Sequence, residues 1–222
     1  MFHALATVEL GQKPSQHYQY AHDYLLHKSE GGPGYEQWQF LGLQGIADVV
    51  ARLNEEKNAA LLSDALSQMP STPLQSFAHS LENIIFERSL FNAILARLKL
   101  ELDSGEDIVL LAALIRSISS QPVGTEKTKI LTEVLQSPMA NEIEVIAAIS
   151  GRCWVDLENK ELLSLFVEKL AFQEQTAFSA ILADLMMIPG MRDLILASMR
   201  SVNRSPELTQ RFGQFMWTIN SS

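Results

Sequence analysis

The sequence predicts an all-α protein, built as a right-handed stack of antiparallel helix pairs, a HEAT-like α-solenoid with about 35 residues per repeat. The main observation is a recurring pattern: residues 108–115 (IVLLAALI) align with residues 143–150 (IEVIAAIS) and, more loosely, with residues 178–185 (FSAILADL). The second helix of the pair also repeats, because residues 131–135 resemble residues 166–170 at the same interval. Such a period is typical of helix pairs that bury their apolar faces against neighbouring pairs.

Helix signals fill the chain from residue 35 onward. Thr72 with Pro73 predicts one helix start, since a hydroxyl cap before proline suits the first helical turn. Ser205 with Pro206 predicts another, and Asn141 occupies a similar capping position. The expected helices cover residues 35–53, 56–68, 73–86, 88–103, 106–118, 126–136, 142–153, 158–171, 174–188, 191–200 and 206–219.

The repeated helices are of two kinds. Residues 108–118 are apolar on nearly all sides, which predicts a buried helix, whereas residues 126–136 have an apolar face and a polar face that includes Lys127. Ala113 and Ala148 hold equivalent positions in the repeat, so we expect both to be small residues between closely packed helices. The regions before residue 104 are interpreted as earlier pairs with a degraded period.

The first 34 residues are interpreted as an amino-terminal extension with a glycine-rich linker, followed by a helical-repeat domain over residues 35–222. Ser15 follows a turn and can cap a helix that runs to about Lys28. Alternating aromatic and polar residues within 18–24 also permit a strand, so both alternatives remain open at this point. Residues 29–34 (SEGGPG) have the composition of a flexible linker.

The composition of the chain disfavours several classes of partner and of covalent structure. The formal net charge of −9 disfavours nucleic acid as a partner, because an acidic surface repels the phosphate backbone. The single cysteine, Cys153, excludes an intrachain disulfide and is expected to be a small buried side chain. No apolar run is long enough to span a bilayer and no signal peptide is visible, so we expect a cytoplasmic protein without a membrane partner.

Two segments resemble an uncharacterised bacterial family, a domain of unknown function: residues 10–15 (LGQKPS) and residues 38–48 (WQFLGLQGIAD). The resemblance covers about the first quarter of the chain. It implies that members are longer at the amino end, so that this chain would be a carboxy-terminal portion. It implies no activity, substrate or catalytic residue.

No metal or cofactor is expected. His17, His22 and His27 stand five positions apart, an interval that turns about 140° around a helix, so they cannot face one ion from a single helix. The glycines of residues 31–34 lack the Lys-Ser/Thr pair of a phosphate-binding loop. Cys153 has no histidine nearby in the sequence to activate it as a nucleophile.

Two candidate surfaces lie near the carboxy terminus. Arginines are concentrated there against few acids, which indicates either a surface for a partner or anion or a solvated edge paired with the protein's own carboxylates. These residues are Arg192, Arg200, Arg204 and Arg211. The last helix carries an apolar stripe that predicts a cap on the preceding helix pair, a homodimer interface or a partner surface. Its residues are Phe212, Phe215, Trp217 and Ile219.

We therefore expect a non-catalytic protein-binding or scaffold module, because the chain combines a clear repeat with no catalytic motif. The partner would be a protein or peptide. The alternative is a HEAT-like repeat enzyme such as a DNA base-excision glycosylase, which needs a basic, aromatic-lined groove with a carboxylate inside it.

Overall fold

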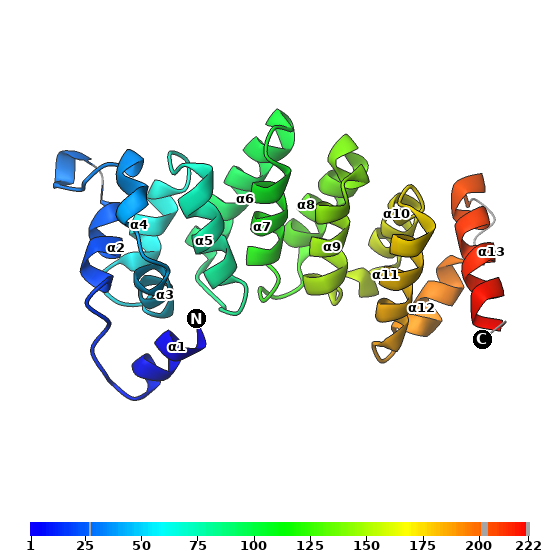
Figure 1. Ribbon diagram of the computed structural model, residues 1–222, viewed down its shortest axis with the longest axis horizontal. Helices are drawn as coiled ribbons and strands as arrows, with labels where there is room; N and C mark the ends of the chain where they lie inside the picture. Colours follow the sequence, from blue (N-terminus) through cyan, green and yellow to red (C-terminus); the bar gives the residue numbers. More distant parts are fainter. Residues whose placement is uncertain (27, 201–203, 221–222) are drawn as a thin grey trace. The chain divides into compact units, whose positions relative to one another are not determined.

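The structure of the chain, a computed structural model, describes residues 1–26, 28–200 and 204–220 (Figure 1). Residues 219 and 220 are described for their backbone only. The described residues form α-helices and short 3-10 helices without any strand, which confirms the predicted all-α class. They group into two compact units, Met1–Pro122 and Val123–Ser222. Among the described residues, no helix has the length and apolarity needed to cross a membrane.

In the first unit, successive helices fall into two layers. Helix α3 contacts α5, and α5 contacts α7, while α4 contacts α6 (Figure 1). The helices of this unit are α1 (Phe2–Glu9), α2 (Tyr18–Leu25), η1 (Lys28–Glu30), η2 (Tyr35–Phe40), α3 (Leu43–Ala51), α4 (Asn58–Ala65), α5 (Ser71–Leu81), α6 (Arg88–Ser104) and α7 (Ile108–Ser117). Each helix therefore packs on the helix two places further along the chain.

The second unit has the same arrangement. Helix α8 contacts α10, and α10 contacts α12, while α11 contacts both α9 and α13. Its helices are α8 (Thr125–Gln136), η3 (Pro138–Asn141), α9 (Ile143–Arg152), η4 (Asp156–Glu158), α10 (Lys160–Leu170), α11 (Gln175–Met187), α12 (Met191–Ser198) and α13 (Pro206–Asn220). The expected helices from residue 56 onward all exist, with ends shifted by a few residues.

The amino-terminal residues belong to the first unit. Helix α2 covers the region for which helix and strand were both open, and it contacts α3 and α4. Helix α1, which no sequence signal indicated, contacts α3.

The two compact units divide between Pro122 and Val123, whereas the boundary predicted from the sequence lies after Gly34. The expected helix at 35–53 is two elements, because the chain is extended at Leu41 and Gly42 between η2 and α3.

The predicted helix caps had mixed outcomes. Ser205 caps α13 as expected, since its hydroxyl accepts a hydrogen bond from the backbone N–H of Leu208 at 3.1 Å. The Thr72 prediction is wrong, because α5 already begins at Ser71, whose hydroxyl accepts a hydrogen bond from the Gln75 amide instead. The Asn141 prediction is also wrong, because this residue ends the preceding 3-10 helix η3.

The burial predicted for Ala113 and Ala148 is confirmed, and the looser third copy of the repeat differs from the first two. Ala113 in α7 and Ala148 in α9 are fully buried, whereas Ala183 in α11 is exposed and its neighbour Leu182 is buried in its place. The third copy therefore presents a face shifted by one position.

We expect Ala113→Leu to lower the free energy of unfolding by about 1–3 kcal/mol, because it adds carbon atoms to close-packed space. Ala183→Leu should change it by less than about 0.5 kcal/mol, as is usual for an exposed site. Urea denaturation of both variants measures the difference. Equal effects at the two positions would contradict the assigned burial.

Candidate functional site

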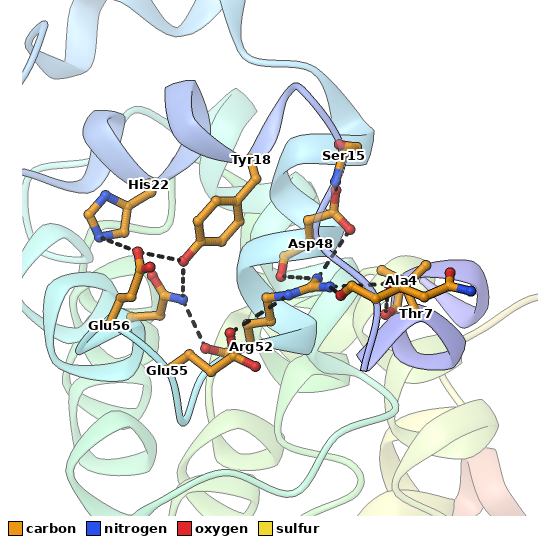
Figure 2. A network of polar contacts seen from close by, with 11 residues as sticks. Ala4, Thr7, Ser15, Tyr18, His22, Asp48, Arg52, Glu55 and Glu56 are labelled. Atoms are coloured by element: carbon orange, nitrogen blue, oxygen red, sulfur yellow. Dashed lines mark hydrogen bonds and ion pairs between the residues drawn. The ribbon is translucent and has the colours of Figure 1, made fainter. Parts of the chain in front are cut away.

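A buried ion pair on α3 organises the amino-terminal part of the first unit (Figure 2). Asp48 and Arg52 lie one helical turn apart, their side chains are 4% and 2% exposed, and Arg52 Nη1 lies 3.4 Å from Asp48 Oδ1. Arg52 Nη2 also donates hydrogen bonds to the carbonyl oxygen of Gln12 at 3.1 Å and to the Thr7 hydroxyl at 3.3 Å. Asp48 Oδ2 accepts a hydrogen bond from the backbone N–H of Ser15 at 3.0 Å.

These contacts join the two segments that resemble the uncharacterised family. Residues 10–15 supply the backbone groups, and residues 38–48 supply the Asp48 carboxylate. Gly11, in the first of these segments, lies in the turn that follows α1 and has a φ of +62°, a conformation that glycine adopts without a steric penalty. The charged pair therefore holds the turn after α1 against α3.

A second polar cluster fixes α2 beside the loop that precedes α4. The Tyr18 hydroxyl donates to Glu56 Oε2 at 3.1 Å and accepts from the Asn58 amide at 3.0 Å, while His22 Nε2 lies 3.9 Å from Glu56 (Figure 2). Burial raises the pKa of Tyr18 above its ordinary value, and the hydrogen bond from Asn58 opposes this rise. Both clusters connect segments of the first unit that are 33–40 positions apart in the sequence, so we interpret them as structural.

Gly45 permits the close approach of α2 to α3. A Cβ atom at this position would lie 2.5 Å from the carbonyl oxygen of His17 and 3.0 Å from the Ala21 side chain. Gly213 in α13 is the opposite case, since a Cβ atom there would meet nothing within 4 Å.

We expect Gly45→Ala to lower the free energy of unfolding by about 1–3 kcal/mol, because backbone atoms must move apart to admit the methyl group. The matched variant Gly213→Ala should raise it by about 0.5–1 kcal/mol, because alanine has the higher helix propensity. Thermal denaturation of the two variants should therefore give shifts of opposite sign. A Gly45→Ala protein as stable as wild type would show that α2 and α3 lie further apart than the Cβ distances at Gly45 indicate.

The second unit contains an open groove of about 280 Å³ between α9 and α11. Ser150 and Gly151 from the last turn of α9 form one wall, and Trp154 follows them on the turn after this helix. The opposite wall comes from α11 and the residue that follows it, and consists of Ile181, Asp184, Leu185 and Ile188. The volume lies just below the range of about 300–1,000 Å³ that is typical of small-molecule sites.

The groove combines an aromatic ring, aliphatic side chains and one carboxylate. Trp154 is half-buried and Asp184 is exposed. Within the described part of the chain, the Asp184 carboxylate makes no hydrogen bond or ion pair. The Ser150 hydroxyl donates to the carbonyl oxygen of Ile146 at 3.0 Å, and its oxygen retains the capacity to accept a hydrogen bond. We take this groove as the candidate functional site.

None of the groove residues was predicted from the sequence as a functional site, although the sequence held a signal for one of them. In the alignment of the three copies, Asp184 stands where the first two copies have Leu114 and Ile149, both fully buried. A carboxylate that replaces a core residue in a repeat indicates a position turned toward solvent. Trp154 carried no such signal in the sequence, and Cys153, which precedes it, is buried as expected.

The four arginines near the carboxy terminus do not line this groove. Arg192 and Arg200 are exposed, and Arg204 and Arg211 are half-buried. Arg211 Nε donates to the carbonyl oxygen of Ala171 at 3.3 Å. Among the residues that the structure describes, none of the four arginines forms an ion pair with a carboxylate.

The apolar stripe of α13 is divided between inward-facing and outward-facing residues. Phe215 is 4% exposed, and its ring stacks on that of the half-buried Phe212 with 6.2 Å between centroids. Trp217 is 73% exposed. The side chain of Ile219 lies outside the described residues, as does His27 among the histidines. Helix α13 contacts α10 and α11, so these two helices cover the buried part of the stripe.

No group of three or more histidine, cysteine or acidic side chains that could hold a metal ion occurs in the described ranges. Comparison with curated proteins and with solved structures found no match. The family described as "Protein of unknown function (DUF3549)" matches residues 1–216, well beyond the first quarter to which the sequence resemblance was assigned. The chain therefore belongs to the DUF3549 family, which confirms the resemblance to an uncharacterised family.

Proposed function

We propose that the chain is a non-catalytic protein-binding module, in which each unit is a HEAT-like stack of helix pairs with about 35 residues per repeat. The observation that carries the proposal is the contact of each helix with the helix two places along the chain, in both units. Stacks of this kind present a continuous row of helices that suits recognition of an extended partner segment.

Hydrogen bonds between neighbouring pairs support the repeat length. In the first unit, Gln121 donates to the carbonyl oxygen of Ile84, 37 positions earlier, at 2.9 Å. In the second unit, Gln175 donates to the carbonyl oxygen of Arg211, 36 positions later, at 3.1 Å. Because equivalent places in successive pairs lie about one repeat apart, these intervals agree with the period of the sequence pattern.

The exposed face of α9 and α11 is the proposed binding surface. It carries exposed small residues beside the groove, Ala147 and Gly151 on α9 with Ala180 and Ala183 on α11. Small side chains let a partner approach these helices closely, and the groove accepts a larger side chain. Helix α13, whose Phe215 is buried, is proposed to cap this row of helices.

Site-specific crosslinking tests the proposal. A photoreactive amino acid is placed at Ala183 on the proposed surface and, as a control, at the exposed Glu161 on α10 in the other layer. We expect a crosslinked partner protein from a lysate of the source organism at Ala183 but not at Glu161. Equal crosslinking at both positions, or none at Ala183, would contradict the proposed surface.

DNA binding distinguishes the alternative function. The groove has the tryptophan and the carboxylate that a glycosylase would need, but its lining includes no basic residue. We therefore propose protein recognition rather than base excision. Tight, salt-sensitive binding of duplex DNA that is lost in Arg200→Ala would reverse this choice.

A further inference from the structure

We propose that the groove between α9 and α11 binds an arginine side chain carried by a segment of a partner protein. This inference rests on the proposed protein-binding function and specifies the chemistry of the partner. It follows from which groups share the groove and from the size of the space they enclose.

The lining residues match the two parts of an arginine side chain, the guanidinium group and the methylene stem. The Asp184 carboxylate can accept two parallel hydrogen bonds from a guanidinium group. The Trp154 ring offers a surface on which a planar guanidinium stacks, an interaction that a tryptophan makes better than other aromatic residues. Ile181 and Ile188 provide aliphatic surface for the methylene stem, and both are half-buried.

Charge and size restrict the occupant further. Asp184 contributes the only formal charge among the lining residues, so the groove favours a cation and repels a carboxylate or phosphate. Arg152 follows Gly151 in the sequence but does not line the groove. A space of about 280 Å³ suits one long side chain rather than a cofactor. The net charge of −9 favours approach of a basic segment from solution.

The test follows the tryptophan indole resonances by nuclear magnetic resonance while a peptide is added. The chain has three tryptophans, Trp38, Trp154 and Trp217, so a protein labelled with ¹⁵N at tryptophan gives three indole N–H signals. The probe is the pentapeptide Gly-Ala-Arg-Ala-Gly with an acetylated amino end and an amidated carboxyl end. The matched peptide carries citrulline, which has nearly the same shape without the charge, in place of arginine.

We expect the Trp154 signal to shift and saturate with the arginine peptide, while the Trp38 and Trp217 signals stay in place. The citrulline peptide should bind at least about 10-fold more weakly, because the charged hydrogen bonds are lost. No movement of the Trp154 signal with the arginine peptide, or equal binding of both peptides, would overturn the proposal.

Two pairs of variants locate the binding. Asp184→Asn should weaken the arginine peptide at least about 10-fold, and Asp193→Asn, which removes an exposed carboxylate from α12, should not. Gly151→Phe should block the groove, and the position has room for the Cβ atom of the new side chain, which would meet nothing within 4 Å. Gly213→Phe places the same side chain at an equally open position of α13 and should leave binding unchanged.

The variants also separate this inference from the proposed function. If Asp193→Asn weakens the peptide as much as Asp184→Asn, the attraction is that of the whole acidic surface and the arginine site is wrong. In another outcome, the partner protein still crosslinks at Ala183 when the chain carries Asp184→Asn or Gly151→Phe. That result would reject the arginine site, and the proposed protein-binding function would stand. Unchanged circular dichroism and melting temperature in each variant confirm that the fold is intact.

Discussion

Replacing Lys127 by methionine is expected to lower the free energy of unfolding by about 3–5 kcal/mol, because it leaves a buried carboxylate without its counter-charge. Lys127 on α8 and Asp156 at the start of η4 are each 1% exposed, and Lys127 Nζ lies 2.8 Å from Asp156 Oδ2. Asp156 Oδ1 accepts no hydrogen bond from the described residues, so the lysine is the main compensation for this charge. Chemical denaturation of the variant measures the loss.

A double replacement is the control for this prediction. Lys127→Met combined with Asp156→Leu removes both charges and should recover most of the loss, since an apolar pair of similar volume avoids the desolvation of two ions. If the double variant is no more stable than Lys127→Met alone, then packing rather than charge explains the effect.

The pH dependence of Lys127→Met gives a second measurement. Burial raises the pKa of Asp156 above its ordinary value, while Lys127 opposes the rise. Removing the lysine should therefore raise this pKa further. A carboxyl group whose pKa is higher in the folded state favours folding below its unfolded pKa of about 3.9, and this contribution is lost as the pH rises through the folded value. The difference in the free energy of unfolding between wild type and Lys127→Met should thus be smaller near pH 4 than at pH 7.

The second large effect is expected for Arg52→Met, which should also lower the free energy of unfolding by about 3–5 kcal/mol because the buried Asp48 loses its counter-charge. The variant also loses the hydrogen bonds to Gln12 and Thr7 that hold the turn after α1. We therefore expect faster amide hydrogen exchange in residues 2–12 in addition to the loss of global stability.

Glu55→Gln is the matched control, because Glu55 is 53% exposed and lies 3.8 Å from Arg52 Nε. Glu55→Gln should change the free energy of unfolding by less than about 1 kcal/mol, as is usual for an exposed ion pair. Unchanged exchange in residues 2–12 of Arg52→Met would show that apolar contacts of α1, and not the arginine, hold this segment.

Local patterns explain why most of the helices could be predicted. The apolar spacing that marks a helix face, and caps such as Ser205, lie within a few residues of each other and act before any tertiary contact exists. Helix α1 was missed because it has no side-chain cap and its only buried residue is Ala4, so neither a helix start nor an apolar face marks it in the sequence. Its stability comes from contact with α3, which the sequence around it does not report.

Buried charges could not be predicted from the same patterns. Lys127 lies in an amphipathic helix where it was assigned to the polar face, yet it is fully buried. That assignment is wrong because the position of a lysine on a helix does not reveal that Asp156, 29 residues later, will compensate its charge. A buried charge is tolerated only when such a partner meets it, and the meeting depends on how helices pack.

The sequence by itself determined the all-α class, the buried character of α7, and the equivalence of Ala113 and Ala148, since each follows from periodic apolar spacing. Only the tertiary structure decided that Asp48 and Arg52 hold the amino-terminal turn and that Trp154 and Asp184 line one groove. Asp48 and Arg52 lie 33 and 40 positions from their contacts at Ser15 and Gln12, and Trp154 lies 30 positions before Asp184. Their proximity follows from the packing of whole helices, which balances many small contacts that no single stretch of sequence contains.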